Sequence, residues 1–179
     1  MPPSLLLGLA ALSAAHATPT AAHESPHASV ESPHAAPGEA RNIVAVRGLA
    51  GAAQHGDHAR PMCGGGVFFE RLLIPHTLEA EVAVNVLVGP NTTEVPVELL
   101  AKVPLHVGRS VEISPGIGGL LAFEGGSPRP TPGLIANADL YLWFDGDLAW
   151  LVELDGIALL SPGGPTAQIE AGSGLAVRF

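Results

Sequence analysis

The sequence predicts an all-β chain: an antiparallel up-and-down meander of six to eight strands that forms a small barrel, preceded by a disordered N-terminal segment. Apolar residues recur at every second position over most of residues 79–179, which is the period of a strand. Stretches rich in Gly, Pro, Asn and Asp separate these runs, and such residues supply hairpin geometry. The runs are also longer than the average strand of about 5 to 6 residues.

The N-terminus has the pattern of an export signal. In MPPSLLLGLAALSAAHA an apolar run, Leu5 to Leu12, is followed by small residues, and Ala15-His16-Ala17 fits the small-x-small cleavage rule. No Lys or Arg precedes the run, so the amino terminus alone supplies positive charge. We expect residues 1–17 to be a signal peptide; the alternative is an ordinary buried helix.

Residues 18–66 are predicted to be a disordered His/Pro/Ala-rich segment. They contain a near-repeat, ESPHASV then ESPHAAP, with nothing large to bury, so ordering them gains too little to offset the entropy cost. The best local metal candidates are His55, His58 and Cys63, but no recognisable ligand set surrounds them. We therefore interpret the segment as a solvated linker and expect no metal and no cofactor; a periplasmic metal-binding role of the His-rich segment is the alternative.

Six runs in the predicted barrel domain, residues 67–179, alternate between an apolar and a polar row. The clearest is EVPVELLAKVPLHV, where every odd position from Val95 to Val107 is apolar and the even positions include Glu94, Glu98 and Lys102. The six predicted strands cover residues 79–88, 94–107, 111–123, 134–144, 148–160 and 169–179.

Eight strands is the usual minimum for a single-chain membrane barrel. The stretch 66–78 is ambiguous between a strand, a cap and a short helix. Either 66–78 and part of 42–50 add the missing strands, or the barrel is incomplete, or chains associate into an oligomer.

Two environments produce such alternation. In a soluble barrel the apolar rows face inward, whereas in an outer-membrane barrel they face lipid and the charges face the lumen. The long strands, the uniform Val, Leu and Ala of the apolar rows and the export signal favour the membrane. So does loop asymmetry, because the longest loop, 125–133, falls at the end opposite the chain termini.

The final stretch, GSGLAVRF, resembles the C-terminal signal of bacterial outer-membrane β-barrels, with Gly174, Leu175, Val177 and Phe179 at its positions. Residues 68–179 as a whole resemble small uncharacterised outer-membrane barrel proteins of Gram-negative bacteria, through FFERLLIPHTLEAEVAVNVL, VPVELLAKVPLHV, SPGIGG and GLAVRF. The resemblance implies a location in the outer membrane, with lipid and the barrel-assembly machinery as partners. It implies no activity.

The polar rows define the candidate functional site. In a membrane barrel they line the lumen, where they form either a plug of ion pairs, which we favour in so narrow a barrel, or a weakly cation-selective path. The lumen-facing residues are Glu94, Glu98, Lys102, His106, Asp139, Glu153, Asp155, Glu170 and Arg178.

Other function classes find little support. The formal net charge of −9 disfavours nucleic acid as a partner. The sequence contains no GxSxG, HExxH or phosphate-loop motif, so no enzyme is expected. The leading hypothesis is a non-enzymatic outer-membrane barrel with a structural, adhesin-like or narrow-pore role. The alternative is a secreted or periplasmic soluble barrel that binds an apolar ligand.

Overall fold

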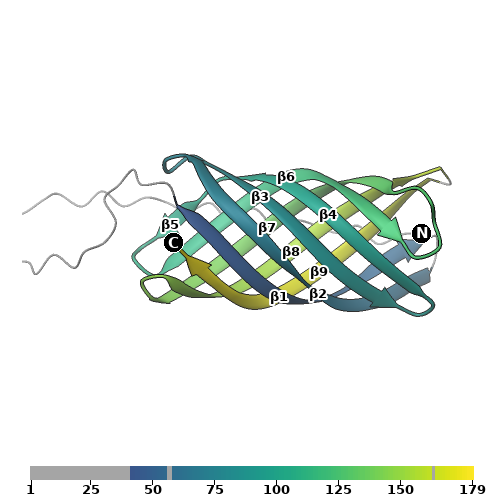
Figure 1. Cartoon of the computed structure of the whole chain (residues 1–179), viewed down its shortest axis with the longest axis horizontal. Helices are drawn as coiled ribbons and strands as arrows, with labels where there is room; N and C mark the ends of the chain where they lie inside the picture. Colours follow the sequence, from purple (N-terminus) through teal and green to yellow (C-terminus); the bar gives the residue numbers. More distant parts are fainter. Residues whose placement is uncertain (1–40, 56–57, 163) are drawn as a thin grey trace, which may run out of the picture. The chain divides into compact units, whose positions relative to one another are not determined.

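A closed antiparallel β-barrel forms from the residues that the computed structural model describes, 41–55, 58–162 and 164–179 (Figure 1). Its strands are β1 (Asn42–His55), β2 (His58–Ile74), β3 (Leu78–Gly89), β4 (Thr92–Lys102), β5 (Leu105–Val107), β6 (Val111–Glu124), β7 (Thr131–Asp145), β8 (Leu148–Ser161) and β9 (Gly164–Arg178). Both β4 and β5 pair with β6 and follow each other along it, so they act as one interrupted strand. The barrel therefore has eight strands.

Closure comes from the pairing of the first strand with the last. β1 pairs with β9 from Ile43↔Arg178 to Gln54↔Ala167. Beyond this ladder, the backbone N–H of Asn42 and that of Phe179 each donate to the other residue's carbonyl oxygen at 3.0 Å. The predicted up-and-down meander is confirmed at the upper end of its strand range, and the ladder closes within one chain.

The expected boundary between extension and barrel at residues 66 and 67 is wrong. All of β1 and the first half of β2 lie inside the range 18–66 that was predicted to be disordered. The small residues of these strands, including Gly64 to Gly66, hid their alternation from a pattern based on large apolar side chains. The predicted signal peptide, 1–17, and the segment up to residue 40 lie outside the described residues.

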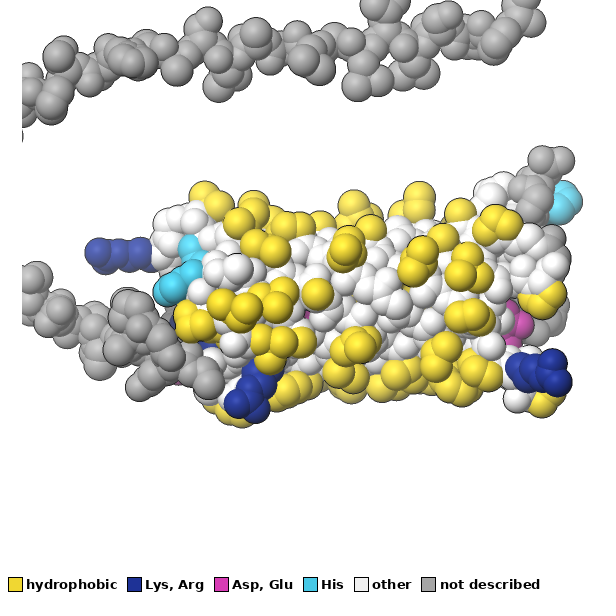
Figure 2. All heavy atoms as spheres, turned by 90° about the horizontal axis from the view of Figure 1, so that it is seen from above, with side chains coloured by type: hydrophobic (Ala, Val, Ile, Leu, Met, Phe, Trp, Pro, Cys, Tyr) yellow, Lys and Arg dark blue, Asp and Glu magenta, His cyan; other side chains and the backbone are white. Residues whose placement is uncertain are grey.

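The outer surface is apolar and the interior is charged. Leu99, Leu134 and Ile169 on the outward rows are each at least 60% exposed, whereas Glu98 and Glu170 on the inward rows are buried. On the face seen in Figure 2, apolar side chains cover the wall between the ends, and Lys and Arg side chains lie toward the ends. This distribution is the reverse of the one that the soluble-barrel alternative requires.

Short turns join the strands at both ends. Arg41 and Phe179 lie at one end, here called the terminal end, with turns at 75–77, 108–110 and 146–147. At the opposite end, here called the loop end, residues 90–91 join β3 to β4 and a six-residue connection, 125–130, joins β6 to β7. The longest turn is thus at the end predicted for it. The described residues include no helix long and apolar enough to cross a membrane.

Candidate functional site

Charged and polar side chains fill the barrel interior. Among the described residues, eight Glu and two Asp are buried, against one Arg and one Lys. An eight-stranded barrel leaves an interior just wide enough for side chains, so these groups meet one another rather than a wide water channel. The buried polar set is Arg47, Glu70, Glu79, Glu81, Asn85, Glu94, Glu98, Lys102, Glu112, Ser114, Asn137, Asp139, Glu153, Asp155, Thr166, Gln168 and Glu170.

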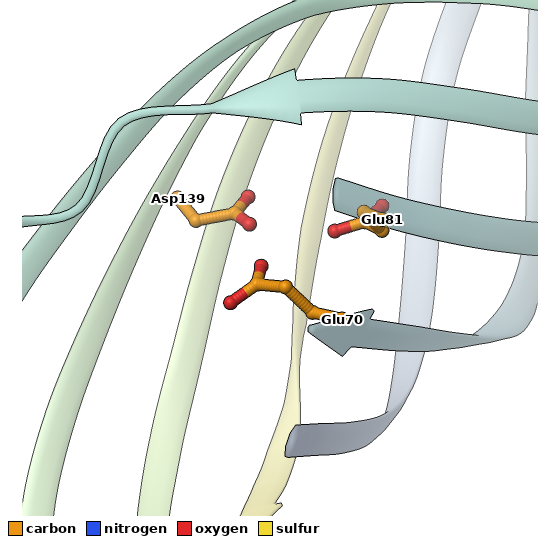
Figure 3. Close-up of side chains that lie close together, drawn as sticks. All are labelled: Glu70, Glu81 and Asp139. Atoms are coloured by element: carbon orange, nitrogen blue, oxygen red, sulfur yellow. The ribbon is translucent and has the colours of Figure 1, made fainter. Parts of the chain in front are cut away.

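Three of these carboxylates surround one lysine. Glu70, Glu81 and Asp139 project from β2, β3 and β7 toward one another, with one oxygen of each within 4.8 Å of the others (Figure 3). The Lys102 ammonium donates to Glu70 Oε2 at 3.3 Å and also to Glu81 and Asp139. Tyr141 Oη lies 3.2 Å from the same Glu70 oxygen. Such a triad has the chemistry of a divalent cation site. Because an ammonium already bonds all three members, we assign it to Lys102 and call it the lysine cluster.

One arginine forms a second cluster across the lumen. Arg47 donates to Glu98 Oε2 at 3.2 Å and also to Glu153, so β1 is joined to β4 and β8. Its Nε and Nη2 donate to Asn85 Oδ1 at 3.3 and 3.1 Å, while Asn85 Nδ2 donates to Glu98 Oε1 at 2.8 Å. The amide therefore holds both the guanidinium and its counter-ion in place. We call these four residues the arginine cluster.

Phe68 and Asn137 connect the two clusters. The Phe68 ring centroid lies 5.2 Å from both Arg47 Cζ and Lys102 Nζ, within the range of cation–π attraction. Asn137 Nδ2 lies 3.0 Å from Asp139 of the lysine cluster and 3.3 Å from Glu153 of the arginine cluster, and it donates to both. It also donates to Asp155 Oδ1 at 2.8 Å. A continuous network thus crosses the middle of the lumen.

Glycines in the wall make room for the long cationic side chains. Gly66 pairs with Arg47 on one side and with Asn85 on the other, and a Cβ at Gly66 would lie 1.8 Å from Asn85 Oδ1. Gly116 pairs with Lys102, and a Cβ there would lie 2.7 Å from the lysine Cγ. The glycines inside these strands therefore belong to the architecture of the clusters.

The terminal end carries a third ion-pair group. Arg41, just before β1, donates to the two oxygens of Glu112 at 2.9 and 2.8 Å and also to Glu79. Trp143 Nε1 donates to Glu112 at 3.3 Å, and His106 Nε2 lies 3.3 Å from the same carboxylate. Burial tends to lower the pKa of Arg41, but its bonds to Glu112 and Glu79 outweigh this and hold the pKa above its usual range.

The loop end differs because its carboxylates have few donors. Gln168 Nε2 donates to Glu94 at 3.4 Å, but neither Gln168 Oε1 nor either carboxylate oxygen of Glu170 has a hydrogen-bond partner. Beside them lies a cavity of about 260 Å³ at the loop-end mouth. Its lining comprises Ala53, Arg60, Met62, Thr92, Glu94, Glu124, Leu159, Ser161, Thr166 and Gln168.

The residues of the predicted polar row do not all lie inside. Two of them lie at the terminal end: His106 has an exposed side chain, and Arg178 is half-buried with a cation–π contact to Trp143 at 4.5 Å. The members that are buried in the interior are Glu94, Glu98, Lys102, Asp139, Glu153, Asp155 and Glu170.

Of the weak metal candidates, the two histidines lie at neighbouring positions and Cys63 lies apart. His55 and His58 are paired positions at the end of the β1–β2 hairpin. Cys63 is exposed and lies five residues further along β2, about 16 Å from His58 on an extended strand. The structure places no third ligand with them among the described residues.

The residues of the predicted assembly signal fall into two groups. Gly174 faces inward opposite Arg47, and a Cβ there would lie 2.0 Å from the Val46 carbonyl oxygen. Leu175 and Val177 point outward and are exposed, as is Phe179 after the end of β9.

Among the charged residues that form ion pairs, sequence reasoning missed Arg41, Arg47 and Glu70. Arg41 and Arg47 fell in the segment predicted to be disordered, and Glu70 fell in the ambiguous stretch. The signal that would have found Arg47 is the alternation of Val44 and Val46 with residues of the opposite face. With only two large apolar residues in the row, the glycines around it dominated the pattern.

Comparison with known proteins identifies the fold. No family model matches the chain, and no curated protein sequence matches it. Among solved structures, it is similar to Neisserial surface protein A, with a TM-score of 0.67 and 10% identity over 77% of this chain and 97% of that one. It is also similar to OprG from Pseudomonas aeruginosa (TM-score 0.53, 8% identity, 78% and 95% covered). A third is Ail, the attachment invasion locus protein of Yersinia pestis (0.53, 8%, 79% and 99%). The chain has the fold of small outer-membrane β-barrels.

Proposed function

We propose that this chain is a non-enzymatic barrel of the Gram-negative outer membrane, embedded in lipid and closed by its own interior charges. One observation carries the proposal: apolar side chains cover the outside while ten carboxylates are buried within. Water would not favour that exterior, whereas hydrocarbon would, and only a closed barrel satisfies every strand edge in lipid. The similarity to outer-membrane barrels agrees with this location.

A closed interior follows from how the clusters fill it. The arginine and lysine clusters join β1, β2, β3, β4, β7 and β8 across the lumen with Phe68 between the two cations. Separating such buried pairs leaves uncompensated charge, which costs about 3–5 kcal/mol for each pair. The network therefore acts as a plug, and we expect no open pore.

The loop end offers little surface for an adhesin-like role. Its fully described connections are the two-residue turn 90–91 and the six-residue connection 125–130. Because a specific protein interface takes about 800 Å² from each partner, we expect so few loop residues to be too small a surface for adhesion. The described part of the chain thus favours a structural role over adhesion.

Delivery of the barrel is a further part of the proposal. The chain would be exported through the signal-like residues 1–17 and then recognised by the barrel-assembly machinery. The terminal end, where Arg41 lies, would face the periplasm, and the N-terminal extension that precedes Arg41 would lie there too. The candidate recognition residues Leu175, Val177 and Phe179 all point outward, where an assembly factor can reach them.

Membrane fractionation tests the location. The full chain is expressed in a Gram-negative host, and the outer-membrane fraction is run on a gel with and without boiling. We expect the protein in that fraction, with a mobility that changes on boiling as a closed barrel unfolds. Recovery in the soluble periplasmic fraction with a single mobility would contradict the proposal.

Two adjacent positions on β4 give a matched pair for the same test. Val97 points outward, and Val97→Glu places a carboxylate in hydrocarbon, so we expect a reduced inserted fraction. Glu98 points inward, and Glu98→Leu leaves the lipid face unchanged, so we expect insertion to persist. In a soluble barrel, Val97 would lie in the core and Glu98 would face water. Val97→Glu would then unfold the protein, and Glu98→Leu would make it less soluble.

A cation-selective path is the second candidate, favoured by the excess of buried acids over buried bases. Single-channel recording in planar lipid bilayers separates it from the plug. The plug predicts no conductance steps at neutral pH, whereas reproducible cation-selective steps would support the path and contradict the plug.

A further inference from the structure

We propose that the loop-end half of the lumen contains a binding site for a divalent cation, with Glu170 as its central ligand. The site is formed by Glu94, Asp155, Gln168 and Glu170, here called the acceptor cluster. The inference rests on three observations: acceptor oxygens without donors, an excess of negative charge, and a cavity that gives access from outside.

The first observation is the state of Glu170. Its side chain is buried, with 1% relative exposure, and neither carboxylate oxygen has a hydrogen-bond partner. Two residues nearer the mouth on β9, Gln168 is also buried, and its Oε1 has no partner. These three buried acceptor oxygens belong to residues two positions apart on the inward row of β9, and none of them has a donor. A donor or a cation would compensate them, because burial without compensation costs several kcal/mol.

The second observation is the charge around Glu170. Asp155 is its direct neighbour across the β8–β9 ladder, and Glu94 and Glu98 also interact with it electrostatically. Arg47 is the base that interacts electrostatically with Glu170, and it is already bonded to Glu98 and Glu153 of the arginine cluster. Arg60 lines the cavity at the loop-end mouth and has no ion pair with any member of the acceptor cluster. The acceptor cluster thus differs from the lysine cluster, where an ammonium bonds to every carboxylate, because no base among the described residues bonds to Glu94, Asp155 or Glu170.

The third observation is access. The cavity of about 260 Å³ at the loop-end mouth is lined by Glu94 and Gln168, so it reaches the outer members of the acceptor cluster. Carboxylate and amide oxygens are the ligands that Ca²⁺ and Mg²⁺ prefer, and Ca²⁺ tolerates an irregular set of six to eight oxygens completed by water. The chemistry of the site therefore fits a hard divalent cation, and Ca²⁺ best.

Calorimetric titration of the full-length barrel with Ca²⁺ in detergent micelles, after treatment with chelator, tests the proposal. We expect saturable binding by the wild type. Glu170→Gln keeps the size of the side chain and removes its charge, so affinity should fall at least about tenfold. Asp147→Asn is the matched control, because it removes one carboxylate from an exposed turn at the terminal end and should bind like the wild type.

A second readout guards against misfolding of the variant. Ca²⁺ should raise the unfolding temperature of the wild type and of Asp147→Asn but not that of Glu170→Gln, since a ligand stabilises only the state that binds it. Boiling-dependent mobility of each variant shows that its barrel has closed. Absence of Ca²⁺ binding by a closed wild-type barrel, or equal binding by Glu170→Gln, would overturn the proposal, and water or a proton would then satisfy these oxygens.

Discussion

Carboxylates line both halves of the lumen, but among the described residues only those toward the terminal end are bonded to cationic side chains. Toward the terminal end, Arg41, Arg47 and Lys102 each bond at least two carboxylates. Toward the loop end, Glu170 has no donor at all, and Glu94 has an amide at 3.4 Å. One half is thus an ion-paired plug and the other an acidic vestibule.

This difference predicts that removing a buried carboxylate has opposite effects on stability at positions only a few residues apart along the strands. Removing a carboxylate from the plug leaves a buried cation short of a partner, which destabilises the barrel. Removing one from the vestibule relieves repulsion among like charges, which stabilises it when no cation is bound. Comparing variants of the two halves tests whether this distinction is real.

The largest effect is expected for Lys102→Met. This change keeps the volume of the side chain but leaves Glu70, Glu81 and Asp139 without their shared cation, so the free energy of unfolding should fall by about 3–5 kcal/mol. Urea titration in lipid vesicles, followed by the fluorescence of Trp143 and Trp150, measures it. Lys102→Arg retains the charge, so its free energy of unfolding should fall by less. Equal losses in the two variants would indicate that Lys102 acts through packing rather than through its charge.

A smaller loss is expected for Glu81→Gln in the plug. The variant weakens one charge-assisted bond to Lys102, and bonds of this kind are worth about 1.5–3 kcal/mol. The same urea titration applies. A gain in stability would mean that repulsion among the three carboxylates outweighs their attraction to Lys102, and the contrast between the halves would fail.

Gly66→Ala tests whether the wall glycines serve the arginine cluster. The new methyl group would collide with Asn85 Oδ1, which accepts from Arg47, so we expect a loss of about 1–3 kcal/mol. Gly156→Ala is the control, because its Cβ would meet its nearest neighbour, a backbone oxygen, at an ordinary 4.0 Å. Comparable losses at both positions would point to a general cost of side chains in these strands.

The smallest effect, and one of opposite sign, is expected for Glu170→Gln in the presence of chelator. Removing a carboxylate with no donor should raise the free energy of unfolding by about 1 kcal/mol. Ca²⁺ should bind and stabilise the wild type but not the variant, so adding it should reduce or reverse this difference in the free energy of unfolding. Destabilisation by this variant in chelator would show that Glu170 has a compensating partner in solution.

The alternation of apolar and polar residues was enough to predict most of the strands. From residue 79 onward each predicted strand is present, and Glu98, Asp139 and Glu153 lie on the predicted inward side. The first two strands escaped because their inward row includes Arg47 and Gly66, which look like linker residues until the opposite wall is known. The sequence also could not predict which charged side chains form ion pairs. Lys102 bonds to Asp139, 37 residues away in the sequence, and spacing along one strand cannot indicate such a contact.

The sequence by itself determined which side chains share a face, because a strand alternates its residues with a fixed period of two. It also determined that the faces differ in polarity. Only the tertiary structure decided that the charged face is enclosed, since that depends on β1 pairing with β9. Closure likewise decided which carboxylates receive a cation: register and curvature bring Arg47 and Lys102 to some of them and leave Glu170 with none.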